Sequence, residues 1–178
     1  QSSITVNHAK GSSNFDQIIF ACHSDQALAL LSDPNEDEQT VLSGLSYQEN
    51  DVILHHDDSL MPERKLAWAS WNFLAGEQSA NQPPIVTYCM NILQSLKSEI
   101  PLLVSLNARN KIDPEKILRE FSYSHPVYSY QAIDSQSRRS DICGSDRIHY
   151  CGAYWYSGFH EDGVKSALDV ASRFGKEL

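Results

Sequence analysis

The chain has few basic residues and no long apolar run. Its 178 residues hold 14 Lys and Arg against 23 Asp and Glu, which gives a formal charge of −9. Affinity for a polyanion comes largely from Lys and Arg, so this balance argues against a nucleic-acid-binding protein. No segment reaches the roughly 18 uncharged apolar residues of a membrane span, and the N-terminus lacks the layout of a signal peptide. We therefore expect a soluble, cytoplasmic chain.

Several chemistry-bearing motifs are also missing. The chain contains no C-x-x-C pair, no G-x-S-x-G nucleophile elbow and no P-loop. Its four cysteines are scattered, and we expect buried free thiols rather than disulfides or a metal site. They are Cys22, Cys89, Cys143 and Cys151.

The composition is that of an ordinary globular protein, with 41% hydrophobic and 21% charged residues. A chain of this length buries about 70% of the surface that its unfolded form exposes, which is enough for one core or two small sub-domains. The sequence starts at Gln1 without a Met and enters strand-like sequence almost at once. We interpret this start as a sign that the chain is a piece of a longer polypeptide.

The pattern of residues predicts a βα unit, then a sheet, then a second βα unit. The apolar run 16–22 is typical of a strand covered on both faces, and capping signals at Ser24 and at residues 33–36 predict two helices, the second ending at Gly44. Short β-branched or aromatic runs then predict an antiparallel sheet. The predicted strands are 51–56, 66–73, 85–90 and 102–106.

The remaining third of the chain returns to mixed structure. We expect a short helix at 113–118, an edge strand or extended segment at 119–130 because of Pro126, and a helix-to-loop segment at 131–146. A strand at 147–151, a glycine- and aromatic-rich loop and a helix from Glu161 complete the chain. The helix spacing is carried by Val164, Ala167, Leu168, Ala171 and Phe174.

The strand, loop and helix at 147–174 form the most informative stretch. The first N–H groups of a helix lack internal partners and carry a partial positive charge, so an electron-rich group is stabilised there. Gly163 in the first turn lets a planar ligand approach the backbone without meeting a Cβ. The spacing alone leaves a second interpretation open, in which this is a packed corner whose glycines serve only the turn.

This stretch resembles the C-terminal FAD-contacting motif of flavin-dependent amine oxidases and related desaturases. More narrowly, three segments are similar to a bacterial group of NAD/FAD-binding, flavin-containing amine oxidase-like proteins in the amine oxidase and phytoene desaturase superfamily. The segments are ACHSDQALALL at 21–31, WASWN at 68–72, and CGAYW at 151–155 followed by GFHEDG at 158–163. The resemblance extends over nearly the whole chain.

The resemblance implies a fold class, a cofactor and a missing part. Such proteins open with a G-x-G-x-x-G turn that cradles the FAD pyrophosphate, and no such motif occurs here. The chain therefore resembles the C-terminal portion of an α/β flavoprotein, an α+β fragment with a central antiparallel substrate-domain sheet. Residues 1–32 and 146–178 would belong to the FAD-binding domain and residues 33–145 to the substrate domain. The missing N-terminal region would be its partner, and exposed apolar surface would favour self-association.

The family motif also implies which residues contact the flavin. Gly152 and the residues after it would face the ribityl and pyrophosphate side, and Asp162, Gly163 and Val164 would offer N–H groups to the pyrimidine edge, stabilising charge on the reduced flavin. Many amine oxidases have an acidic residue directly after the first glycine, where this chain has Ala153. The full set implied is Gly152, Ala153, Tyr154, Trp155, Gly158, His160, Glu161, Asp162, Gly163 and Val164.

Other candidates are weaker. Trp68, Trp71, Asn72 and Tyr88 could line a substrate pocket, although large aromatic residues in a sheet are more often core. The run His55-His56-Asp57-Asp58 resembles a metal site in composition, but neighbouring strand residues point to opposite faces, so we expect a solvated strand end and no metal. His160 and Glu161 could shuttle a proton near the flavin, yet Glu161 could equally complement the helix dipole. No catalytic residue is assigned.

The leading hypothesis is a fragment of an FAD-dependent oxidoreductase that acts on a small molecule, an amine or an apolar lipid-like substrate, and that is inactive alone. The alternative is a non-catalytic α+β module that binds a peptide or lipid through its aromatic sheet and uses no flavin. A metal-dependent hydrolase is a distant third possibility.

Overall fold

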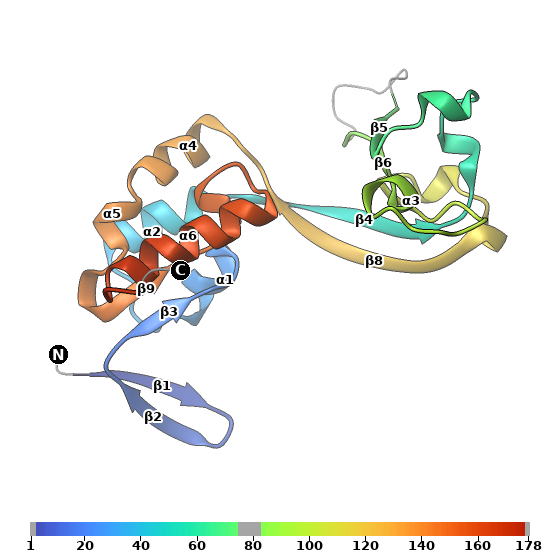
Figure 1. Ribbon diagram of the computed structural model, residues 1–178. Helices are drawn as coiled ribbons and strands as arrows, with labels where there is room; N and C mark the ends of the chain where they lie inside the picture. The colour runs from blue at the N-terminus through green and yellow to red at the C-terminus, as the bar shows by residue number, and fades with distance from the viewer. Residues whose placement is uncertain (1–2, 75–82, 177–178) are drawn as a thin grey trace. The chain divides into compact units, whose positions relative to one another are not determined.

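A computed structural model describes residues 3–74 and 83–176, which fall into two compact units (Figure 1). The first unit combines the segments 1–47 and 126–178, and the second holds residues 48–125. The chain thus passes from one unit to the other at 47–48 and returns at 125–126. These divisions differ in position from the boundaries expected for cofactor and substrate domains, at 32–33 and 145–146. The assignment of those domains stays a prediction.

The first unit contains a hairpin, a short parallel sheet and five helices. The hairpin pairs β1 (Ile4–His8) with β2 (Gly11–Phe15), and β3 (Ile18–Phe20) pairs in parallel with β9 (Ile148–Tyr150). The helices are α1 (Ser24–Leu30), α2 (Glu36–Ser43), α4 (Tyr130–Ser137), α5 (Arg139–Ile142) and α6 (His160–Ser172). The two parallel strands come from opposite ends of the sequence, so the unit exists only when both ends of the chain meet.

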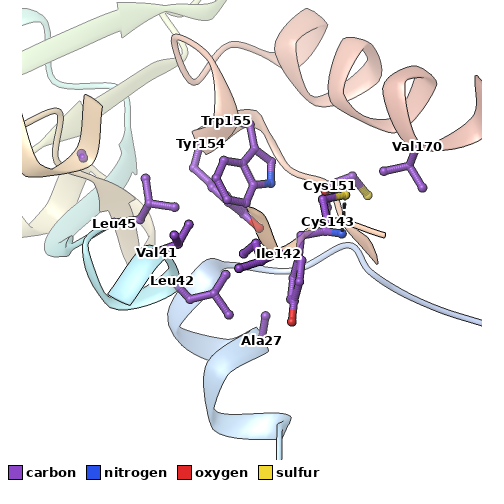
Figure 2. Close-up of a cluster of buried hydrophobic side chains, with 12 residues drawn as sticks. Ala27, Val41, Leu42, Leu45, Ile142, Cys143, Cys151, Tyr154, Trp155 and Val170 are labelled. Atoms are coloured by element: carbon purple, nitrogen blue, oxygen red, sulfur yellow. Dashed lines mark hydrogen bonds between the residues drawn. The ribbon is translucent and has the colours of Figure 1, made fainter. Parts of the chain in front are cut away.

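Apolar side chains from both segments form the core of this unit (Figure 2). Val41 and Leu42 of α2, Ile142 of α5, Tyr150 of β9 and Val170 of α6 are 0–1% exposed. Burial of apolar area at about 25 cal/mol per Å² is the main force that holds such a core. The cysteines Cys143 and Cys151 lie in the same cluster with free thiols.

Two side chains tie the start of α2 to strand β9. Glu38 is only 5% exposed; one carboxylate oxygen accepts from the N–H of Asn35 at 3.0 Å and the other from the hydroxyl of Tyr150 at 2.8 Å. The Asn35 side chain in turn accepts from the N–H of Glu38, which completes the capping box. Burial of Tyr150, with the nearby carboxylate, raises the pKa of its hydroxyl and keeps it a neutral donor.

The second unit is built on a five-stranded sheet in the order β5-β6-β7-β4-β8. Its strands are β4 (Tyr47–His55), β5 (Trp71–Phe73), β6 (Val86–Cys89), β7 (Leu103–Leu106) and β8 (Ile117–Pro126), and a short helix α3 (Met90–Leu93) follows β6. The β4–β7, β5–β6 and β6–β7 pairs are antiparallel. The α+β fold class expected from the sequence is confirmed, as is the edge position of the strand that ends at Pro126.

The strand expected over residues 66–73 is wrong in its first half. Residues 65–67 form a 3₁₀ turn, and only 71–73 pair with β6. The reason lies in Asn72, whose side-chain oxygen accepts from the N–H of Ala69 and whose amide donates to the Ala69 carbonyl. An Asn side chain that satisfies nearby backbone groups competes with strand pairing. Similarly, the short helix expected at 113–118 is a 3₁₀ turn at 114–116 followed directly by β8.

No helix in the described parts of the chain is long and apolar enough to cross a membrane.

Arg139, whose side chain is 15% exposed, contacts three parts of the first unit through its guanidinium. It donates to the carbonyl of Tyr150 at 3.0 Å, to the carbonyl of Ser166 at 2.9 Å and to the carboxylate of Asp169 at 2.7 Å. Its guanidinium also lies over the ring of Trp155, 5.4 Å from the centroid. The end of β9, the loop after it and helix α6 therefore share one cation.

We expect R139M to lower the free energy of unfolding by about 2 kcal/mol, because the carbonyls of Tyr150 and Ser166 and the carboxylate of Asp169 each lose a charged donor. The neighbouring Arg138, which pairs with the exposed Asp37 and Asp141, provides a matched control. R138M should lower the free energy of unfolding by less than about 1 kcal/mol, because surface ion pairs contribute little to stability. Urea unfolding of both variants measures the difference, and equal losses would contradict the role assigned to Arg139.

Candidate functional site

The segment with the strongest sequence signal lies at the carboxyl ends of two parallel strands. The N–H of Cys151, directly after β9, donates to the carbonyl of Phe20 at the end of β3. Each strand is followed by a helix, β3 by α1 and β9 by α6. In open α/β sheets, ligands bind outside the carboxyl ends of parallel strands. The corner formed by residues 151–164 therefore follows the carboxyl end of a parallel strand.

Side chains from two helices hold the loop of this corner in place. The side-chain amide of Gln136 in α4 donates to the carbonyls of Tyr154 and Tyr156, both at 2.7 Å. The hydroxyl of Ser166 in α6, itself fully buried, accepts from the N–H of Gly152 at 2.8 Å. Since these contacts satisfy the loop's own backbone, its shape does not depend on a ligand.

Two of the three glycines in the corner are explained by packing. A Cβ at Gly152 would lie 2.3 Å from the ring of Tyr154, and one at Gly158 would lie 2.3 Å from the hydroxyl oxygen of Tyr128. Gly158 also has φ of +88°, which favours glycine. Gly163 differs, because a Cβ there would meet nothing within 4 Å. The interpretation in which the glycines serve only the turn therefore holds for Gly152 and Gly158 and leaves Gly163 unexplained.

The first turn of α6 combines free donors with its own carboxylates. By helix geometry, the N–H groups of His160 and Glu161 have no acceptor within the helix. The carboxylate of Asp162 accepts from the N–H of Phe159 at 3.0 Å, which caps the turn. An electron-rich group, such as the pyrimidine edge of a flavin, could approach beside Gly163 without steric conflict, so the residues present fit that cofactor at this point.

The ten residues implied as flavin contacts do not share one environment. Tyr154 and Trp155 are 3% and 4% exposed and belong to the hydrophobic core, so their side chains face inward (Figure 2). Gly152, Ala153, Asp162 and Gly163 are half-buried, and the other four are exposed. Residues 154 and 155 could therefore reach a ligand through their backbone but not through their side chains. Whether any of the ten residues binds FAD stays a prediction.

The second unit presents a half-exposed apolar sheet face, defined here by eight residues in two cross-strand rows. Paired residues project to the same side of a sheet, and the register gives the two rows directly. They are Trp71, Tyr88, Val104 and Leu54, and Phe73, Val86, Leu106 and Val52. Trp71 and Phe73 are 61% and 56% exposed. The opposite side holds Ile53, His55, Thr87, Cys89, Leu103 and Ser105, all buried.

The apolar sheet face contains two of the four expected substrate residues. Trp71 and Tyr88 lie directly opposite each other on β5 and β6. Asn72 projects to the other side and fixes the turn before β5, while Trp68 packs against the Met61, Cys89 and Leu103 cluster and donates to the carbonyl of Pro62. Sequence reasoning missed Phe73, Val86 and Val104, although the period-two alternation of the predicted strands would have placed them beside Trp71.

The His55 to Asp58 run forms a structural network. The N–H of Asp57 donates to Nδ1 of His55 at 3.2 Å, so the proton of the neutral ring sits on Nε2 and is donated to Ser105 Oγ at 2.8 Å. His55 therefore cannot take a proton from Ser105, and both are fully buried. Burial would raise the pKa of Asp57, but the N–H of Asp113, the Lys116 ammonium and Ser59 hold it below its usual range.

Within the described ranges, no three His, Cys, Asp or Glu side chains come together as a group that could hold a metal ion.

Comparisons with known proteins give structural likeness without sequence matches. No family model matches the chain, and no curated protein sequence does. Among solved structures, it is similar to a protein from Exiguobacterium sp. 255-15 provisionally named protoporphyrinogen oxidase, with a TM-score of 0.65 and 13% identity, over 97% of this chain and 44% of that one. It is also similar to the CLA-producing fatty acid isomerase of P. acnes, with a TM-score of 0.63 and 13% identity, over 97% and 45%.

The chain thus spans less than half the length of either structure. At this identity the likeness is one of fold, and it agrees with the α+β architecture described above.

We expect opposite effects from alanine at the two glycines of the corner. G152A forces the methyl group against the Tyr154 ring and should lower the free energy of unfolding by about 1–3 kcal/mol. G163A adds a methyl group in open space and improves helix propensity, so it should raise stability by about 0.5–1 kcal/mol. Thermal and urea unfolding check both, and a destabilised G163A would show that the space beside Gly163 is occupied by the protein itself.

We also expect the chain to lose stability in mild acid because of His55. Burial lowers the pKa of His55, so the unfolded chain binds a proton more readily than the folded chain, and acid favours unfolding. The free energy of unfolding should therefore fall as the pH drops below about 6.5. Urea unfolding at several pH values in this range should show that the free energy of unfolding changes less with pH in H55Q than in the wild type. H8Q, in the exposed hairpin, is the control for loss of one imidazole, and an unchanged slope in H55Q would contradict the prediction.

Proposed function

We propose that this chain is part of an FAD-dependent oxidoreductase of the amine oxidase and desaturase superfamily. The observation that carries the proposal is the open space beside Gly163, in the first turn of the helix that follows a parallel strand. Neither packing nor backbone conformation requires a glycine there, and a glycine inside a helix costs about 0.5–1 kcal/mol relative to alanine. A ligand that passes close to the backbone explains it.

The two units would make different contributions. The corner at 151–164 would offer the N–H groups of the first turn of α6 to the flavin, and the apolar sheet face would contact an apolar part of the substrate. FAD, when bound, would supply the hydride-accepting chemistry. The chain's own residues would position the cofactor contacts and exclude water. Gln136 and Ser166 hold the loop in shape. Trp71, Phe73 and Tyr88 would exclude water from the substrate.

Support for an apolar substrate comes from the sheet. The apolar sheet face has eight residues from four strands, and the most exposed of them, Trp71 and Phe73, are aromatic. One of the two solved structures named above is a fatty acid isomerase, and the other is provisionally named a protoporphyrinogen oxidase. An unsaturated or amine-bearing substrate with an apolar chain is therefore the class to screen first.

A second candidate function is a binding module that uses the apolar sheet face without any flavin. The same two exposed aromatic residues favour it, because a sheet face of this kind could receive an acyl chain or a peptide directly. Whether the complete protein binds FAD distinguishes the two candidate functions.

The test is an FAD titration of the complete gene product that contains this chain. We expect yellow protein, and we expect G163V to weaken FAD affinity about tenfold or more, because overpacking a contact surface costs about 1–3 kcal/mol. S172V, in the last turn of the same helix and exposed, is the matched control and should bind FAD as the wild type does. Complete protein that binds no FAD under any condition would overturn the proposal and favour the binding module.

A further inference from the structure

A second concave site lies in the first unit, near the amino ends of the parallel strands. It is a polar cavity of about 550 Å³. Its lining comes from the start of β3, the turn before β9, β9 itself and the end of α6: Gln17, Gly144, Asp146, Arg147, His149, Arg173 and Phe174. The corner at 151–164 follows the carboxyl ends of the same strands, so the two sites share strands and helix but no residues.

His149 carries the argument because it is buried and incompletely bonded. Its side chain is 5% exposed, its ring packs edge-on against Phe174 at 4.9 Å, and Nε2 lies 3.0 Å from the amide oxygen of Gln17. An amide oxygen only accepts, so Nε2 holds the ring proton and Nδ1 presents a lone pair. Nδ1 is buried without a partner in the described part of the chain. A buried acceptor left unpaired costs about 1–3 kcal/mol, so a ligand that donates to it is favoured.

The charges around His149 select for an anion. Arg173 lines the cavity and, within the described residues, makes no ion pair. Arg147 and Asp146 also line it, and Arg147 donates to the carbonyl of Asp16 at 3.3 Å. The Arg173 guanidinium lies where a side chain at position 144 would be, so Gly144 makes room for it. Burial and the nearby Arg173 lower the pKa of His149, so its ring is neutral near neutral pH.

The ligand must therefore bring both negative charge and a proton. A carboxylate or a sulfate ion has no proton to donate at neutral pH, and a sugar hydroxyl has no charge. A phosphate group that retains one P–O–H has both, with acceptor oxygens for a guanidinium group. We propose that this cavity binds a protonated phosphate group, whose P–O–H donates to Nδ1 of His149 while Arg173 neutralises its charge.

The test compares inorganic phosphate with sulfate by calorimetric titration of the complete gene product at about pH 7.5, where a lowered-pKa histidine is neutral. We expect phosphate to bind about tenfold more tightly than sulfate, the effect of one charge-assisted hydrogen bond. H149F should abolish this difference in affinity, and R173Q should weaken the binding of both ions. R119Q, which removes an arginine of the second unit that stacks on Phe121, should change neither.

Equal affinity for the two ions in the wild type, or wild-type phosphate binding by R173Q, would overturn the proposal. Should H149F fail to fold, the Nδ1 resonance of His149 in the wild-type protein gives the same information, since phosphate and not sulfate should shift it. Vesicles of phosphatidylcholine with and without phosphatidic acid distinguish the source of the phosphate. Capture only by the vesicles with phosphatidic acid assigns a lipid headgroup, and binding of inorganic phosphate alone assigns a soluble ligand. The proposal does not depend on FAD binding.

Discussion

The end of the first unit depends on the guanidinium of Arg139, because strand β9, the loop after it and helix α6 all contact this one cation. Arg139 donates to carbonyls at the end of β9 and within α6 and to Asp169. Asp169 also accepts from the hydroxyl of Tyr156 at 2.5 Å. A planar guanidinium with five donors in fixed directions can satisfy such a set, and a lysine cannot. Arg139 thus acts with Gln136 and Ser166 in positioning the loop between β9 and α6.

That constraint bears on function, since a site built on a preorganised loop does not spend binding energy on ordering it. Gln136 and Ser166 hydrogen-bond the backbone of the loop at 152–158 without any ligand. Its large side chains, Tyr154 and Trp155, face the core and anchor it. What remains for a ligand is the loop backbone, the open space beside Gly163 and the exposed side chains of the first turn of α6. The loop itself is therefore suited to contact a flat group through its backbone, and His160 and Glu161 are the nearest side chains that could carry chemistry.

The sequence predicted elements wherever local and tertiary preferences agree, and failed where a single side chain overrides the pattern. The helices from Ser24 and near Glu161 and the strand around Ile148 have clear periodicity and caps, and they occur as expected. The strand expected through Trp68 fails because Asn72 closes a turn on Ala69. Trp71 and Tyr88 were expected as pocket residues on composition, but the cross-strand register that adds Phe73 and Val104 is a tertiary property. The Arg139 network joins residues up to 30 positions apart, so no local sequence pattern predicts it.

Helix α6 explains why the two ends of the parallel strands should receive different ligands. Its N-terminus, beside Gly163, carries partial positive charge and stabilises electron density, whereas its last turn carries partial negative charge. An anion near Arg173 is thus opposed by the helix itself, and the Arg173 guanidinium must outweigh both that field and Asp146. Charge alone is a weak basis for affinity at such a position. A proton shared with the unpaired Nδ1 of His149 adds a contact that the helix field does not oppose, and selectivity there should follow the ligand's proton more than its charge.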